Sequence, residues 1–380
     1  MEHKCTENCV RVKLSTHLDY NRRLNHTDNF HSKALIVRRG NEIIFTVEAR
    51  DHPLTHWQFE IKHRLANQST TISSDTPSQS NWKITKSKKS STEHELKIGI
   101  PVTAEIGHYN MTVKLNAEVF SLEPPLVILF NPWHPLDTVG YHSSKVEKQT
   151  EFIEEYVSSS TGMIYFGSSE SPLGIPWNYG QYTDGLLDII LSLLYQNKGF
   201  QMSHFSQPTM VVTSLAHLIS KVMTVNEGGS EEDSISSFTW RSAADIFQLY
   251  NVDNRPVRFG SCFCLGALLT CACRALGVPC RPVTVFNANH DKCKFHKPSN
   301  NFTINIDLDQ PELSEKWWLF HIWNECWMAR PDLTLSSLRY SEEDWQLVDS
   351  SPSTKSSNIR GPVPRKAILE GFVDLSFYPS

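Results

Sequence analysis

The chain lacks several features that would point to whole classes of function. No run of about 18 apolar residues occurs in it, so no segment is expected to cross a membrane. Its first residues, "MEHKCTENCVRVKL", contain no apolar core of the kind that a secretory signal needs. Positive charge is not in excess either: the net charge of −5 argues against a general nucleic-acid binder, which needs a basic surface.

Cysteine pairs with the spacing of a zinc site are also missing. The chain has 9 cysteines but no C-x-x-C pair. An odd number of cysteines without an export signal predicts free, reduced thiols, and therefore a cytoplasmic protein. Apolar residues make up 39% and charged residues 20% of the 380 residues, which is typical of a folded protein with two or three domains.

Residues 1–130 show the pattern of a β-sandwich. Residues 41–50, "NEIIFTVEAR", are rich in β-branched side chains, and residues 109–116 alternate between apolar and polar. A short apolar run at residues 126–130 predicts a buried strand. The polar, Ser/Thr-rich stretch at residues 67–93, which includes the basic run "KITKSKKSS", is expected to be a long, solvated surface loop.

Residues 131–380 change character and predict an α+β domain. Helices come first, and strands follow. The expected helices are residues 183–197, capped by Thr183 or Asp184, residues 208–225, and residues 242–251, capped by Ser242. The expected strands are residues 281–287, 302–308, 317–328 and 345–351.

A segment rich in cysteine, "VRFGSCFCLGALLTCACRALGVPCRP", lies between these helices and strands. Its apolar run, followed by Gly277 in the place of a helix-ending glycine, predicts a buried helix over residues 262–276. Residues two apart on a helix point about 200° apart, so neighbouring cysteines of the C-x-C pairs cannot face one metal ion. Cys264, Cys271 and Cys273 are therefore interpreted as core thiols.

Cys262 differs from the other cysteines because it begins the predicted helix. Unpaired N–H groups and the positive end of the helix dipole favour a thiolate at that position. The alternative interpretation, a buried core thiol, stays open on position alone. Cys262 is the candidate nucleophile.

His321 and Asp349 are candidate partners for this cysteine. His321 lies on a strand that alternates as "WWLFHIWNECWM", where it can be held rigidly, although a histidine among aromatic residues can also be a core residue. The following strand, "WQLVDSSP", should pair antiparallel with it and bring Asp349 beside His321. A carboxylate there would orient the imidazole, so the order Cys, His, Asp is typical of papain-like thiol acyl transfer.

These segments resemble the animal transglutaminases, or protein-glutamine γ-glutamyltransferases, over nearly the whole chain. The similar segments are "VRFGSCFC", "CRALGVPCRPVTVFNANHD", "LFHIWNECWMARPDL", "WQLVDSSP" and "GPVPRKAILEG", preceded by "LIVRRG", "FNPWHPLD" and "IPWNYGQYTDGLLDI". The resemblance implies an immunoglobulin-like β-sandwich at residues 1–130. It also implies a papain-like catalytic core at residues 131–380 that is short at its C-terminal end.

The resemblance further implies residue roles and a reaction. Cys262 would be the nucleophile, His321 the base and Asp349 its orienting partner, while Trp240 would stabilise the oxyanion. The enzyme would be an acyltransferase that forms a thioester with a protein glutamine and passes it to a lysine or polyamine amine. Calcium would be the cofactor, and no nucleic acid would be a partner.

The chain departs from the family pattern at several places. Ser261 and Phe263 flank the nucleophile where the family has Gln and Trp, and the expected calcium ligands after Asp291 are partly replaced. Two alternatives therefore stay open: a non-catalytic scaffold of the same fold, and a glutamine deamidase in which water takes the place of the amine.

Overall fold

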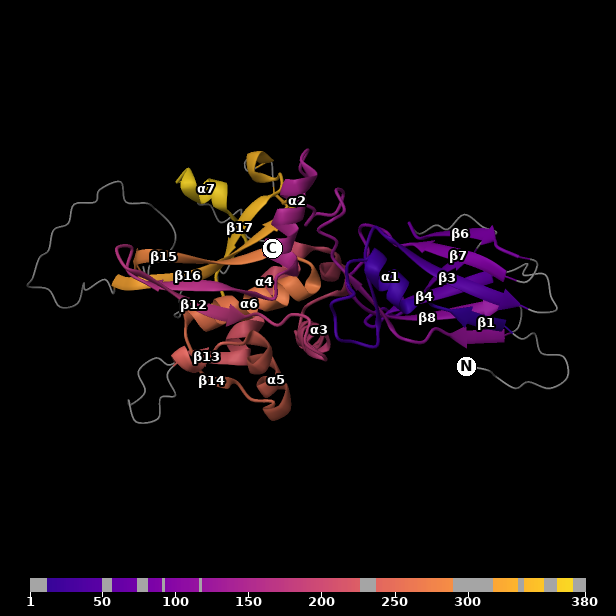
Figure 1. The fold of residues 1–380 in the computed structure, drawn as a ribbon, viewed down its shortest axis with the longest axis horizontal. Helices are drawn as coiled ribbons and strands as arrows, with labels where there is room; N and C mark the ends of the chain where they lie inside the picture. The colour runs from indigo at the N-terminus through magenta and orange to yellow at the C-terminus, as the bar shows by residue number, and fades with distance from the viewer. Residues whose placement is uncertain are drawn as a thin grey trace, which may run out of the picture. The chain divides into compact units, whose positions relative to one another are not determined.

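The computed structural model describes residues 12–49, 57–73, 81–90, 93–115, 118–225, 237–289, 317–333, 338–351 and 361–371. The chain divides into two compact units, which Figure 1 shows in ribbon form. The first unit comprises Met1–Asp137 with Gln201–Gln207, and the second comprises Thr138–Phe200 with Pro208–Ser380. Within the described ranges, no helix has both the length and the apolar character needed to cross a bilayer.

The first unit consists of two β-sheets, as the sequence predicted. One sheet has the order β1-β3-β7-β6, and the other has the order β2-β10-β8-β4-β5 with β9 added beside β8. The elements are β1 (Val12–Ser15), α1 (Leu18–Leu24), β2 (Leu35–Arg38), β3 (Glu42–Ala49), β4 (Trp57–His63), β5 (Thr70–Ser73), β6 (Lys83–Lys88), β7 (Glu93–Gly99), β8 (Gly107–Leu115), β9 (Glu118–Ser121) and β10 (Leu126–Leu129).

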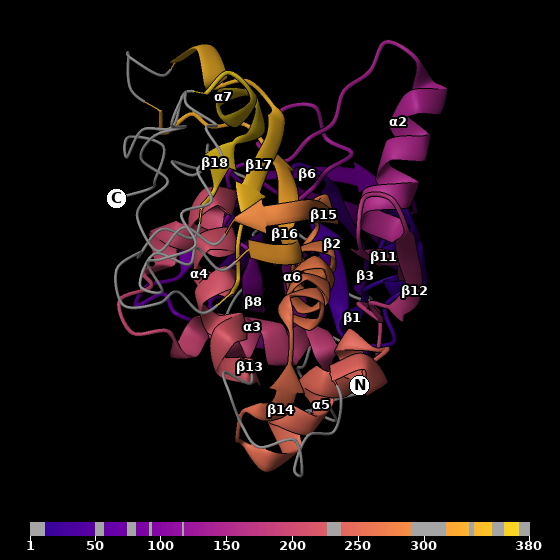
Figure 2. The same cartoon turned by 90° about the vertical axis from the view of Figure 1, so that its left-hand side faces the viewer.

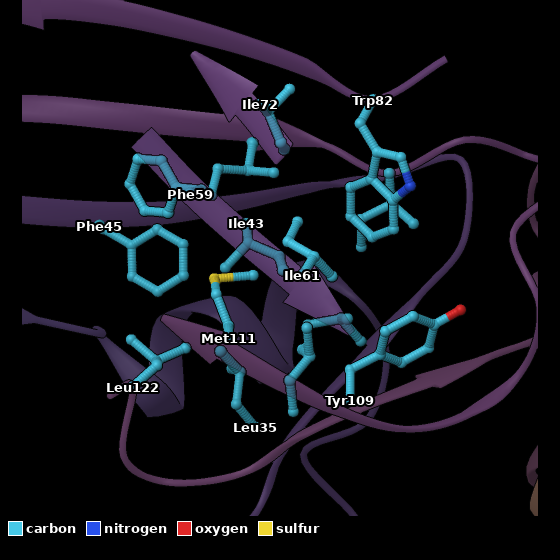
Figure 3. Close-up of a cluster of buried hydrophobic side chains, with 14 of the residues drawn as sticks. Leu35, Ile43, Phe45, Phe59, Ile61, Ile72, Trp82, Tyr109, Met111 and Leu122 are labelled. Atoms are coloured by element: carbon cyan, nitrogen blue, oxygen red, sulfur yellow. The ribbon is translucent and has the colours of Figure 1, made fainter. Parts of the chain in front are cut away.

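The core of this unit is filled by alternate side chains of both sheets. Ile43 and Phe45 come from one sheet, and Phe59, Ile61 and Met111 come from the other; all are at most 2% exposed. Figure 3 shows these side chains converging between the strands. The period-two pattern at residues 109–116 therefore marks a strand with one buried face.

The polar stretch at residues 67–93 is not a loop throughout, and that expectation was wrong. It contains β5, which pairs with β4, and β6, which pairs with β7. The β6 strand ends its sheet, and its side chains are mostly exposed. Backbone hydrogen bonds hold such an edge strand, so its side chains need not be apolar, and composition alone misses it.

A buried ion pair stabilises the end of this unit. The guanidinium of Arg39 donates to both carboxylate oxygens of Asp137, each at 2.6 Å. The backbone N–H of Asn131 also donates to Asp137, at 2.9 Å. These contacts explain why "LIVRRG" and "FNPWHPLD", far apart in the sequence, carry charged residues in otherwise apolar surroundings.

The second unit is α+β, with helices mostly preceding a four-stranded sheet of order β15-β16-β17-β18. Its elements are α2 (Val146–Ile153), a π-helical turn (Glu154–Ser158), β11 (Thr161–Gly167), β12 (Pro172–Asn178), α3 (Leu186–Gln196), α4 (Pro208–Val222), β13 (Met223–Val225), α5 (Ala243–Asp253), β14 (Val257–Gly260), α6 (Cys262–Leu276), β15 (Cys280–Asn289), β16 (Trp317–Met328), β17 (Asp344–Val348), β18 (Val363–Pro364) and α7 (Arg365–Leu369). The strand expected at residues 302–308 lies outside the described residues.

The cysteine-rich helix α6 is the centre of this unit. It spans Cys262–Leu276, and Gly277 ends it with a left-handed φ of 90°, both as predicted. All of its residues are buried. The helix packs against β16, where Gly266 allows Ile322 to approach closely. Figure 2 shows α6 beside the strands β15 and β16.

Helix capping was predicted correctly in one of two cases. Ser242 accepts a hydrogen bond from the N–H of Asp245 and caps α5. The helix α3 begins later than expected, because Gly185 with φ 75° occupies its cap position in place of Thr183 or Asp184.

Candidate active site

The structure brings His321 and Asp349 into direct contact. His321 lies on β16, and Asp349 directly follows β17. The two strands pair antiparallel, as the sequence predicted, with Asn324 opposite Val348. The Nε2 atom of His321 lies 2.8 Å from Oδ2 of Asp349.

Cys262 is a neighbour of the same imidazole. It is the first residue of α6 and is 9% exposed. Its side chain lies near enough to His321 to help raise the pKa of the imidazole, whose Nε2 is engaged by Asp349. The three side chains therefore meet around one imidazole, as catalysis by a cysteine nucleophile requires.

The carboxylate of Asp349 is fixed from two directions. Its Oδ2 faces His321, and its Oδ1 accepts a hydrogen bond of 2.8 Å from the backbone N–H of Ser351. Burial opposes ionisation, but the hydrogen bond and charge of His321, together with the N–H of Ser351, lower the pKa of Asp349 overall. Asp349 therefore stays negative at neutral pH.

The imidazole of His321 is strongly basic in this environment. Burial by itself disfavours the imidazolium, but the neighbouring side chains of Asp349 and Cys262 outweigh it. Together they raise the pKa of His321 to about 10. The ring is thus cationic at neutral pH and can stabilise a thiolate beside it.

This shift predicts a pH dependence of stability. The folded pKa of His321, about 10, lies above its usual 6.5, so the stabilisation is complete below 6.5 and disappears as pH rises through about 10. Asp349 stays charged over that range and does not contribute to the change. We expect the unfolding free energy of the chain minus that of His321→Gln to shrink between pH 6.5 and 10, measured by urea titration. A constant difference would contradict this assignment.

The start of α6 presents backbone donors beside the sulfur. The Ser261 side chain forms no cap with the first turn, and its hydroxyl lies 3.8 Å from the sulfur of Cys264 instead. The first N–H groups of a helix have no partner within the helix, so the N–H of Cys262 can serve as a donor to a bound oxygen.

Trp240 lies beside β14, the strand that leads into α6. Its indole Nε1–H donates to the carbonyl of Phe259 at 3.2 Å, and the side chain is partly exposed. Phe259 is three residues before Cys262. Trp240 therefore lies beside the strand that leads to Cys262, and its indole N–H is bonded to the backbone of that strand.

The two unusual neighbours of Cys262 are accommodated by different contacts. Phe263 is 2% exposed and packs against Phe238 and Trp177, at ring separations of 5.0 and 6.1 Å. Ser261 contacts Cys264, as described above. Phe263 is thus part of the aromatic core below the site.

One supporting layer was not predicted from the sequence. Glu325, on the same strand as His321, accepts two hydrogen bonds from Arg281 and forms a second ion pair with Arg365 at 3.3 Å. The guanidinium of Arg281 also stacks on Trp345 at 4.0 Å. These contacts join β15, β16 and β17 and hold the strands that carry His321 and Asp349. The alternation of side chains along β16, which puts Glu325 on the same face as His321, was the sequence signal that could have indicated this layer.

The residues that the structure describes include no cluster of acidic side chains suited to a calcium ion. Among them, the single group of three or more potential His, Cys, Asp or Glu ligands consists of three cysteines. Calcium prefers oxygen ligands and does not bind thiolates. The segment after Asp291, where calcium ligands were expected, lies outside the described residues.

The two units and the Cys–His–Asp contacts define an α+β protein with a β-sandwich and a papain-like core. The comparisons with known proteins agree. A model described as "Transglutaminase family" matches residues 12–116, and one described as "Transglutaminase-like superfamily" matches residues 233–350. The chain belongs to the transglutaminase family.

Individual relatives show the same relationship. Protein-glutamine gamma-glutamyltransferase 4 of Mus musculus is 30% identical over 376 residues, covering 93% of this chain and 51% of the relative. Protein-glutamine gamma-glutamyltransferase 2 of Homo sapiens is 30% identical over 402 residues, covering 97% and 56%. The chain thus spans about half the length of the curated relatives it matches.

A solved structure confirms the fold. The crystal structure of red sea bream transglutaminase superposes with a TM-score of 0.79 at 24% identity, covering 97% of this chain and 58% of that one. At this identity the similarity establishes the fold alone.

Proposed function

We propose that the chain is a protein-glutamine γ-glutamyltransferase that joins protein glutamines to lysine or polyamine amines. The single observation that supports this proposal most is the meeting of Cys262 and Asp349 at the imidazole of His321. We assign Cys262 as the nucleophile, His321 as the acid and base, and Asp349 as the group that orients it. The proposed catalytic domain is residues 131–380.

The first half-reaction forms a thioester. The Cys262 thiolate attacks the carbonyl carbon of a glutamine side chain, and the C–N bond of the carboxamide breaks. The imidazolium of His321 donates its proton to the departing nitrogen, which leaves as ammonia. Neutral imidazole and an acylated sulfur remain.

The second half-reaction transfers the acyl group. An amine attacks the thioester carbon, and neutral His321 accepts a proton from the attacking nitrogen. The C–S bond breaks, which restores thiolate and imidazolium and leaves an isopeptide bond. Asp349 holds the ring in one orientation and stabilises its positive charge in both steps.

Aromatic groups beside the imidazole restrict water. The ring of Trp323 lies 6.1 Å from that of His321 in an edge-on arrangement. Excluding water from the thioester favours the amine over hydrolysis.

Trp240 is proposed to stabilise the oxyanion together with the backbone N–H of Cys262. This role requires its indole N–H to exchange the carbonyl of Phe259 for the substrate oxygen. We expect Trp240→Phe, which keeps the ring but removes the donor, to lower kcat by about 10²–10³ with little change in KM. A rise in KM of similar size with unchanged kcat would instead assign Trp240 to substrate binding.

The experiment that tests the proposed function separates three outcomes. The chain is incubated with a glutamine-bearing protein and a labelled primary amine, and the products are identified by mass spectrometry with ammonia measured in parallel. Acyl transfer to the amine predicts that ammonia is released and that the glutamine carries the labelled amine. Ammonia with glutamate alone would indicate a deamidase, and neither product would indicate a scaffold.

Two further properties are proposed with the function. Calcium dependence rests on the family resemblance and is tested by repeating the assay with calcium and with a chelator. A cytoplasmic location is supported by the six described cysteines, which are all free. Fractionation of the producing cells tests it.

A further inference from the structure

Three cysteines away from the active site meet at one buried point. Cys273 comes from α6, Cys280 from the start of β15 and Cys326 from β16. The sulfur of Cys326 lies 3.6 Å from that of Cys280 and 3.9 Å from that of Cys273, and all three sulfurs lie within 4.8 Å of one another. Each of the three residues is 0% exposed. We call these residues the thiol cluster.

The sulfur spacing matches that of ligands around one ion. With a zinc–sulfur bond of about 2.3 Å and tetrahedral angles, two sulfurs lie about 3.8 Å apart. The separations of 3.6 and 3.9 Å fall on either side of this value. Two of the three sulfur separations therefore match those around one ion, and the third, between Cys273 and Cys280, is at most 4.8 Å.

Rigid elements hold these positions. Cys280 and Cys326 are directly opposite each other in the antiparallel pair β15–β16. Cys273 is on the helix that packs against the same sheet. A site whose ligands all lie on a helix and strands is held in place before an ion binds.

A buried cation beside the cluster favours a negative centre. The guanidinium of Arg274, 4% exposed, donates to the carbonyl of Cys280 at 3.0 and 2.8 Å and to the carbonyl of Ser159 at 2.7 Å. It also lies over the ring of Tyr179. Within the described part of the chain, Arg274 forms no ion pair with a carboxylate. Three thiolates around a divalent ion carry one net negative charge, which would offset this guanidinium.

Polar groups complete the surroundings of the sulfurs. The amide nitrogen of Asn324 lies 3.6 Å from the sulfur of Cys280 and is held by the hydroxyl of Thr270 at 2.8 Å. The Thr270 hydroxyl itself lies 3.9 Å from the sulfur of Cys280. The Asn324 amide donates its two hydrogens to the carbonyl of Gly266 at 2.9 Å and to Thr270, so it is a fixed polar group beside the sulfurs, and Thr270 offers an oxygen at the edge of the site.

We propose that the thiol cluster binds one thiophilic divalent ion such as zinc, with Cys273, Cys280 and Cys326 as its ligands. Binding replaces the thiol protons, which are released to solvent. The ion would tie α6, which carries Cys262 at its other end, to β16, which carries His321. It is a structural site and takes no part in the thioester chemistry.

Metal binding to the 380-residue chain tests this proposal. The reduced protein is treated with a chelator and titrated with Zn²⁺, and separately with Cd²⁺, whose thiolate complexes absorb in the ultraviolet. We expect one tightly bound ion per chain, thiolate absorption with Cd²⁺, and a higher thermal midpoint with Zn²⁺. Cys280→Ser and Cys326→Ser should each lose the tight site and the thermal shift.

Cys271→Ser is the matched control, because Cys271 is equally buried on the same helix but outside the cluster. It should bind like the unchanged chain. Three outcomes would overturn the proposal: no tight binding by the unchanged chain, which needs no variant to fold; equal binding by the serine variants; or a Cys280–Cys326 disulfide in place of bound metal.

Discussion

Cys262→Ala should abolish incorporation of a labelled amine into a glutamine-bearing protein. The variant removes the sulfur that we propose forms the thioester, so we expect the rate to fall by about 10⁶ or to background, as for other catalytic nucleophiles. The alanine fits the helix position, so the fold should persist, which circular dichroism and thermal unfolding can confirm.

Cys264→Ala is the matched control for this prediction. Cys264 lies two residues further along α6, and burial raises the pKa of its thiol to about 11, so it is protonated at neutral pH. The control should keep most of its activity. Normal amine incorporation by Cys262→Ala would remove Cys262 from the mechanism.

His321→Gln should cause a loss nearly as large as that of Cys262→Ala. Without the imidazole, no group donates the proton that ammonia needs or stabilises the thiolate. Side chains that act as one unit give non-additive losses, so the double variant Cys262→Ala, His321→Gln should be no worse than either single variant.

His217→Gln is a suitable control for the histidine substitution, since His217 is exposed on α4. It should leave kcat/KM unchanged. If the double variant lost activity additively, or if His321→Gln kept more than about a tenth of the activity, His321 would not act on Cys262.

Much of the site followed from local sequence patterns. The bounds of α6 were predictable because an apolar run ends at Gly277, which adopts the left-handed φ that favours glycine. The pairing of β16 with β17 was predictable because both segments have strand-like sequences and a turn-rich link joins them. That pairing is enough to place His321 beside Asp349.

Features that depend on contacts between distant segments were not predictable. The thiol cluster joins cysteines 46 and 53 residues apart in sequence, so spacing rules for zinc sites do not find it. The bond from Trp240 to the carbonyl of Phe259 and the pairs formed by Glu325 depend on packing between elements. The edge strand β6 was missed because backbone hydrogen bonds hold it, while its side chains are mostly exposed and show no apolar pattern.

We propose that Cys262, His321 and Asp349 act as one ionised unit. This is tested by the rate at which iodoacetamide alkylates Cys262, followed by peptide mapping across pH in the unchanged chain and in Asp349→Asn. We expect rapid alkylation of Cys262 at neutral and mildly acidic pH, and a marked slowing in Asp349→Asn. Alkylation that becomes appreciable only in alkaline solution, with the same rate in both proteins, would contradict it.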